Sequence, residues 1–210
     1  MTLALIDYGA GNLRSVENAL RAAGAVDIHV TADPGAVAAA ERIVLPGVGA
    51  YAACMGALSA IPGMVDALNR RVRDDGRPFL GVCVGMQLMA DAGEEFGRHP
   101  GLGWIPGVVE KLNPNDASIR VPHMGWNDVI PTGGEAARAA HGLIVPGEAY
   151  FLHSFAFHAE QAADVAATTD HGGRITAAIA RDNLIGVQFH PEKSQAYGLA
   201  LLARFLEWRP

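Results

Sequence analysis

Residues 79–90 read FLGVCVGMQLMA, an apolar run that continues into a helical pattern. The first four residues predict a buried strand, and residues 86–90 predict the start of a helix. Cys83 stands between them, with Gly81 and Gly85 two positions to either side. Small residues at these positions are typical of a nucleophile elbow, where the backbone turns so tightly that a Cβ would clash. The stretch therefore predicts an α/β sheet with a cysteine raised above the carboxyl ends of its strands.

The order of elements around this stretch favours a parallel sheet. Strands are predicted at residues 3–6, 28–30 and 43–45, and helices at residues 13–24 and 64–76. Alternation of this kind is typical of a sheet covered by helices on both faces. Pro, Gly and Asn separate short apolar pieces over residues 103–130, which predicts antiparallel hairpins added to the sheet or its edge. Strands at 150–153 and 185–190 and a helix at 201–208 complete one three-layer α/β domain over residues 1–210, with a mostly parallel central sheet.

The composition limits the classes of function. The chain has 210 residues, half of them hydrophobic, a formal net charge of −6 and no run of Lys or Arg. A nucleic-acid partner is therefore not expected. No apolar stretch approaches the roughly 20 residues of a membrane helix, and the N-terminus has no basic region or signal-type cleavage site. We expect a cytoplasmic protein without membrane association.

The two cysteines have different expected roles. A cytoplasmic chain would keep both Cys54 and Cys83 reduced. Cys54 lies in a helical pattern of small residues and is expected to fill the core. At Cys83 the N-terminus of the following helix favours the reactive thiolate, and the turn directs the Val84 N–H toward a developing oxyanion. The alternative for Cys83 is a core cysteine flanked by packing glycines.

Residues 190–192, His-Pro-Glu, follow a predicted strand. In an extended chain His190 and Glu192 point to the same side, and Pro191 stiffens their spacing. A base must reach the thiol, and a carboxylate must orient the imidazole. By itself the tripeptide is compatible with a plain loop, but beside the cysteine elbow it predicts a Cys-His-Glu triad.

Two glycine-containing turns follow other predicted strands. Residues 46–49, Pro-Gly-Val-Gly, can present the backbone N–H of Gly47 or Val48 to a substrate oxygen, as the second half of an oxyanion hole; a plain loop is the alternative. Gly9 and Gly11 lie where a dinucleotide fingerprint would begin, but its third glycine is replaced by Arg14, so that reading fails. No histidine pair has a zinc spacing with a second cysteine, and neither a metal nor a cofactor is expected.

Taken together, residues 81–87 (GVCVGMQ) and 186–192 (GVQFHPE) resemble class I (triad-type) glutamine amidotransferases over essentially the whole chain. Within that class, residues 6–13 (IDYGAGNL), 46–51 (PGVGAY) and 122–127 (PHMGWN) are similar to the glutaminase subunits of imidazole glycerol phosphate synthases. The triad positions show no departure from the family pattern. No synthase domain is attached, so a separate glutaminase subunit is expected.

The resemblance implies an activity, a partner and further site residues. The activity would be hydrolysis of L-glutamine to L-glutamate and ammonia in histidine biosynthesis. Ammonia would pass to a (β/α)₈-barrel synthase subunit in a heterodimer, which forms imidazole glycerol phosphate and aminoimidazole carboxamide ribotide. Glutamine would be bound at Gly49, Gln87, Ser154 and Phe155, and the partner would be contacted through His123, Met124, Trp126 and Asn127.

Several alternatives stay open at this point. Trp126 could instead pack within the hairpins of this chain, since Trp is usually largely buried. The chain could serve another synthase, although residues 46–49 and 123–126 argue against this. A silent regulatory subunit or a cysteine peptidase-like hydrolase of the same fold is a third hypothesis, against which the intact triad argues.

Overall fold

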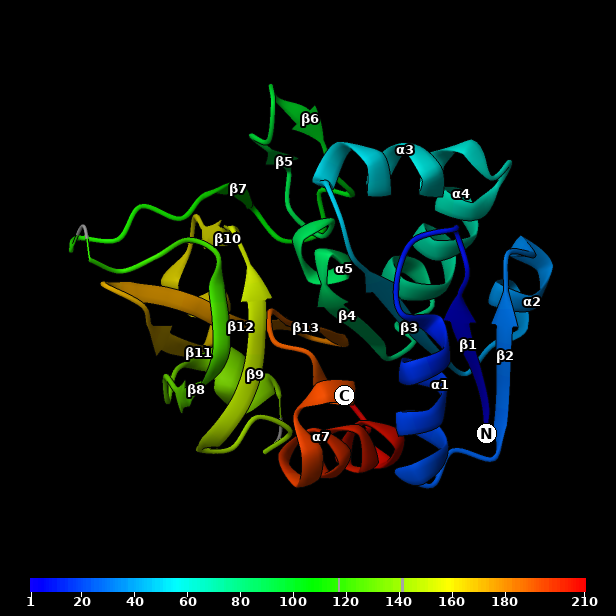
Figure 1. The fold of residues 1–210 in the computed structure, drawn as a ribbon. Coiled ribbons are helices and arrows are strands. Elements are labelled where there is room, and N and C mark those ends of the chain that lie inside the picture. Colours follow the sequence, from blue (N-terminus) through cyan, green and yellow to red (C-terminus); the bar gives the residue numbers. More distant parts are fainter. Residues whose placement is uncertain (117, 141) are drawn as a thin grey trace.

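The computed structural model describes residues 1–116, 118–140 and 142–210. Its largest feature is a nine-stranded sheet in the order β2-β1-β3-β4-β13-β12-β11-β8-β9 (Figure 1). The first five strands in this order are parallel: β2 (Asp27–Thr31), β1 (Thr2–Ile6), β3 (Arg42–Gly47), β4 (Phe79–Cys83) and β13 (Leu184–Val187). Except in the exposed edge strand β2, their residues are almost all buried because helices cover both faces of this half. The predicted α/β class is confirmed.

The other half of the same sheet is antiparallel. It is formed by β12 (Arg174–Arg181), β11 (Val165–Asp170), β8 (His123–Pro131) and β9 (Gly147–His153). A second, four-stranded sheet contains β10 (Phe155–Ala159), β7 (Gly107–Lys111), β5 (Ala92–Gly93) and β6 (His99–Pro100). The hairpin region predicted at residues 103–130 thus divides between the two sheets, with β7 in the small one and β8 in the large one.

Helices cover the parallel strands from two sides. In Figure 1, α1 (Leu13–Ala22) and α7 (Gln195–Glu207) lie side by side on one face. On the other face are α2 (Pro34–Ala39), α3 (Tyr51–Ala60), α4 (Met64–Leu68) with its π-helical continuation Asn69–Asp74, and the short α5 (Val84–Gln87). The helix α6 (Glu135–Ala139) and two 3₁₀ turns, Ala162–Asp164 and Pro191–Lys193, complete the described elements.

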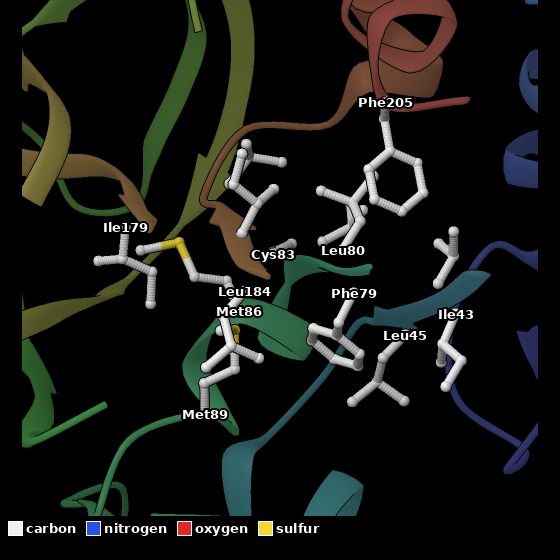
Figure 2. Packing of buried hydrophobic residues seen from close by; sticks show 14 of the residues in the cluster. Ile43, Leu45, Phe79, Leu80, Cys83, Met86, Met89, Ile179, Leu184 and Phe205 are labelled. Carbon is white, nitrogen blue, oxygen red and sulfur yellow. The ribbon is translucent and has the colours of Figure 1, made fainter. Parts of the chain in front are cut away.

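The core joins both faces through the central strand β4. Figure 2 shows Leu80 on the side of Phe205 from α7, and Phe79 on the side of Met89. All four side chains are fully buried. Phe79 also meets Trp104 edge to face, with ring centroids 4.9 Å apart, a favoured aromatic geometry. This two-sided packing fixes β4, and therefore Cys83 at its end, in the middle of the molecule.

Candidate active site

Cys83 occupies a strained turn between β4 and α5. Its φ of 54° and ψ of −111° are rare for a residue with a side chain and cost about 1–3 kcal/mol. The flanking glycines allow the turn. A Cβ on Gly81 would lie 2.6 Å from the carbonyl oxygen of Gly85, and a Cβ on Gly85 would overlap the carbonyl oxygen of Leu45. The chain therefore forms the strand–turn–helix elbow that the sequence predicts.

Strand register brings the other site segments to this turn. In the parallel pairs, Gly47 of β3 is opposite Cys83, and Val187 of β13 is opposite Val82. The strands on either side of β4 thus end beside the cysteine. Residues 47–49 approach from one side, and residues 188–192 approach from the other.

His190 and Glu192 form a buried ion-pair geometry. The His190 Nδ1 lies 2.8 Å from Glu192 Oε1, and both side chains are almost completely buried. Burial disfavours the imidazolium, but hydrogen bonding and charge interaction with Cys83 and Glu192 outweigh burial and raise the pKa of His190 from 6.5 to about 9. The arrangement favours a protonated His190 imidazolium held by Glu192.

The backbone that carries His190 and Glu192 is not the extended chain that the sequence predicted. The strand predicted at residues 185–190 ends at Val187, and Pro191–Lys193 form a 3₁₀ turn. That prediction of the local backbone was wrong, because Pro191 fixes a φ that suits the first position of a helical turn. The turn still places the Glu192 carboxylate on the imidazole.

The main chain of His190 is anchored on both sides. Its N–H donates to the Tyr150 carbonyl at 2.9 Å, and its own carbonyl accepts from the Ser194 hydroxyl at 2.7 Å. The same Ser194 oxygen accepts the Tyr150 N–H at 2.9 Å. Ser194 is fully buried, so these bonds restrict how far the imidazole can move. Sequence reasoning did not find Ser194.

Residues 46–48 are held by two side chains from other elements. The Tyr8 hydroxyl donates to the Pro46 carbonyl at 2.7 Å, and the Cys54 thiol donates to the Val48 carbonyl at 3.3 Å. Burial raises the pKa of Tyr8 far above its usual range, so this donor keeps its proton. A Cβ on Gly47 would lie 2.7 Å from the Gly85 amide nitrogen. Cys54, expected to fill the core, is indeed buried and also restrains this strand end.

A cavity of about 160 Å³ lies over Cys83 and is lined by the chain segments that meet at this turn. It contains all four predicted glutamine-binding residues. Its lining consists of Val48, Gly49, Cys83, Val84, Gln87, Glu95, Leu152, His153, Ser154, Phe155, His190 and Lys193. Glu95 was not predicted, because nothing in its local sequence marks it; its carboxylate also accepts the Tyr51 N–H at 2.7 Å.

Gln188 is a second polar residue that the sequence did not single out. It is fully buried, and its Nε2 donates to Cys83 Sγ at 3.6 Å. Its Oε1 accepts from Gln87 Nε2 at 3.0 Å, and that nitrogen also donates to the Phe155 carbonyl at 3.0 Å. The only signal in the sequence was its place at the end of a strand, two residues before His190.

The four residues predicted to contact a partner divide between the faces of β8. Met124 is 62% exposed and Trp126 is 47% exposed, and Trp126 also meets Tyr150 edge to face, with centroids 6.1 Å apart. His123 is buried and Asn127 is half-buried. Strand alternation sends the second pair inward, so only Met124 and Trp126 present their side chains at this surface.

The described part of the chain contains no cluster of three or more His, Cys, Asp or Glu side chains with metal-binding geometry. His141 lies outside the described residues. Both cysteines are free thiols. Within residues 1–116, 118–140 and 142–210, no single helix is long and apolar enough to cross a bilayer. The two helices Tyr51–Ala60 and Met64–Asp74 together have sufficient length and apolar character, but the chain bends by 93° between them.

Comparisons with known proteins identify the family of the chain. The family model described as glutamine amidotransferase class-I matches residues 4–208, and the chain belongs to that family. It is 61% identical over 211 residues to a protein of Zymomonas mobilis, covering 100% of this chain and 97% of the relative. It is 56% identical over 214 residues to one of Caulobacter vibrioides, covering 100% and 99%. Both relatives are named imidazole glycerol phosphate synthase subunit HisH.

Solved structures agree with the fold. A glutamine amidotransferase crystal structure superposes with a TM-score of 0.74 at 19% identity, covering 99% of this chain and 98% of that chain. PurLQS from Thermotoga maritima superposes with a TM-score of 0.71 at 18% identity, covering 98% and 97%. The mixed sheet flanked by helices is therefore the fold of this family.

Proposed function

We propose that this chain is the glutaminase subunit of imidazole glycerol phosphate synthase and that Cys83, His190 and Glu192 are its catalytic residues. It hydrolyses L-glutamine to L-glutamate and ammonia, and the ammonia serves L-histidine biosynthesis. The observation that carries the assignment of residues is the strained Cys83 elbow, beside a buried His190–Glu192 pair 2.8 Å apart, under one cavity.

The arrangement supports a two-stage mechanism. The Cys83 thiolate attacks the carboxamide carbon, and the oxyanion is stabilised by the Val84 N–H and by the backbone at Gly47 or Val48. The His190 imidazolium gives its proton to the departing ammonia, which leaves a thioester. Neutral His190 then takes a proton from the attacking water, and the thioester is released as glutamate. Glu192 orients the imidazole and stabilises its charged form.

Substrate recognition follows from the groups that line the cavity. Gly49, Ser154 and Phe155 are the proposed backbone and hydroxyl contacts for glutamine. The Gln87 Nε2 is committed to Phe155 and Gln188, which leaves Gln87 Oε1 to accept from the substrate. The Glu95 carboxylate supplies a negative charge suited to the α-ammonium group of an amino acid.

The proposed partner is a (β/α)₈-barrel synthase subunit that receives the ammonia in a heterodimer. Met124 and Trp126 are large apolar side chains exposed on one strand face. Aromatic residues and Met are enriched in interface cores, which supports β8 as part of the contact surface.

Labelling with a glutamine-like electrophile tests the chemistry. We expect mass spectrometry to find one adduct per chain, at Cys83 and not at Cys54, and free glutamine to protect the site. A generic peptide substrate should not be cleaved. Labelling confined to Cys54, or peptide cleavage that depends on Cys83, would contradict the proposal.

A further inference from the structure

Polar side chains between strand β8 and Cys83, joined through the Phe155 carbonyl, form one hydrogen-bonded series. On β8, Asn127 Nδ2 lies 3.0 Å from His123 Nε2. His123 Nδ1 lies 3.0 Å from His153 Nε2, across the β8–β9 register that pairs these two residues. His153 Nδ1 lies 2.8 Å from the Phe155 carbonyl. That carbonyl also accepts from Gln87, which reaches Cys83 through Gln188.

The neighbours of each group fix the direction of these bonds. Asn127 Nδ2 also donates to the Asp170 carbonyl at 2.7 Å, and Asn127 Oδ1 accepts the Asp128 N–H at 2.8 Å. The amide orientation is therefore determined, and His123 Nε2 must accept. His123 then carries its proton on Nδ1 and donates to His153 Nε2. His153 in turn carries its proton on Nδ1 and donates to Phe155.

The same reasoning runs from Phe155 to the sulfur. Because the Phe155 carbonyl can only accept, the Gln87 nitrogen must face it and also reach Gln188 Oε1. Gln188 therefore turns its nitrogen toward Cys83. Each printed hydrogen bond between β8 and the sulfur thus has one direction, and the Phe155 carbonyl accepts from both His153 and Gln87.

Burial keeps both histidines neutral, as this assignment requires. Burial and the neighbouring His153 and His171 lower the pKa of His123 to about 3. Burial, opposed in part by the hydrogen bond to Phe155, lowers the pKa of His153 to about 4. The His123 ring is also stacked between Phe151 and His171, with centroids 4.6 and 4.2 Å away. A neutral, fully paired network in a buried setting is rigid, because breaking one bond leaves a buried polar group unpaired.

We propose that Asn127, His123, His153, Gln87 and Gln188 form a positioning network that couples β8 to the Cys83 sulfur, with His153 and Gln188 as its key positioning residues. The network starts on the inner face of the strand whose outer face exposes Met124 and Trp126. A partner that shifts β8 would thereby alter the donor that Gln188 presents to the sulfur. Only this effect of a partner rests on the proposed function.

The test measures how fast iodoacetamide alkylates Cys83 in the isolated chain, with peptide mass spectrometry separating Cys83 from Cys54. His153→Leu and Gln188→Met should each slow alkylation about three- to tenfold, the range of one net hydrogen bond. The double variant should be no slower than the slower single variant, because both interrupt one series. His153→Asn, whose amide can still reach the Phe155 carbonyl, should retain most of the rate. Ile130→Ala, on the exposed face of β8, is the control and should match the unaltered chain.

Three results would overturn the network: an unchanged rate in His153→Leu, multiplied effects in the double variant, or equal loss in His153→Asn and His153→Leu. If His153→Leu does not fold, nitrogen-15 NMR of the unaltered chain decides instead. We expect both His123 and His153 to be protonated on Nδ1 alone, and protonation on Nε2 of either would refute the assignment. Neither measurement requires glutaminase activity. The network can therefore be confirmed in a chain that releases no glutamate, and it can be refuted in a chain that does.

Discussion

At the residue scale, Cys83 combines a strained backbone with buried charge partners. Its left-handed φ turns the thiol toward the cavity while β4 remains packed on both sides. His190, three residues after the end of strand β13, lines the same cavity as Cys83. Neither residue could hold this geometry on a free loop, because both the φ strain and the burial of charge must be offset by the surrounding core.

The pKa of His190 gives a prediction at this scale. Glu192→Gln removes the carboxylate, so the pKa of His190 should fall from about 9 toward its ordinary 6.5. Nitrogen-15 NMR titration of the imidazole measures this value. A pKa that remains near 9 in Glu192→Gln would contradict the role of the carboxylate.

The same pair predicts how stability depends on pH. Because folding raises the pKa of His190, its stabilising contribution is fully present below 6.5 and is lost as the pH rises through about 9. Glu192→Gln should therefore lower the free energy of unfolding by about 1–2 kcal/mol near pH 6 and by less near pH 10. Urea unfolding at the two pH values measures the difference. A constant or growing difference would exclude this linkage.

At the element scale, glycines set the spacing between β3, β4 and α5. Gly85→Ala should overlap the Leu45 carbonyl, lower the free energy of unfolding by about 1–3 kcal/mol and displace Cys83. Gly56→Ala is the matched control, because Gly56 lies within α3 and a Cβ there meets nothing within 4 Å. It should raise stability by about 0.5–1 kcal/mol. Chemical denaturation of both variants measures the two changes in the free energy of unfolding, which should have opposite signs. Equal changes would refute the steric argument.

The strand end at residues 46–48 yields another prediction. Tyr8→Phe removes the donor to the buried Pro46 carbonyl, which should cost about 1–3 kcal/mol of stability. It should also reduce glutamine turnover more than it reduces Cys83 alkylation, because only turnover needs the oxyanion contact. Equal reductions in both rates would argue against a role for this strand in turnover.

Local sequence patterns predicted the parallel half of the sheet better than the antiparallel half. The elbow and strands β1, β3 and β4 follow from apolar runs and flanking glycines that act within a few residues. Strands β11 and β12 were not expected, because their many Ala and Thr residues lack strong apolar alternation. Gln188, Glu95 and Ser194 were missed because their roles depend on contacts between distant segments. Conversely, His123 and Asn127 were expected to face a partner, and strand alternation turns them inward.

At the scale of the whole molecule, the large sheet connects the parallel half, which holds Cys83, to the antiparallel half, which exposes Met124 and Trp126. Trp126→Ala should weaken binding of the barrel synthase subunit at least about tenfold, as expected for an aromatic anchor. It should change the free energy of unfolding little, since nearly half of the side chain is exposed. Titration of the partner by calorimetry measures the affinity, with Val26→Ala as the comparison, because Val26 is exposed beside β2 at the opposite edge of the sheet. Unchanged affinity in Trp126→Ala would remove this residue from the interface.

The most direct test of the account is glutamate release from L-glutamine by the purified chain mixed with the histidine-pathway barrel synthase subunit, before and after Cys83→Ala. We predict turnover by the unaltered chain and at least a roughly thousandfold loss in Cys83→Ala, while synthesis from added ammonia continues unchanged. Glutamate release that survives Cys83→Ala would contradict the assigned nucleophile, and no release by the unaltered chain with its partner would contradict the proposed function itself.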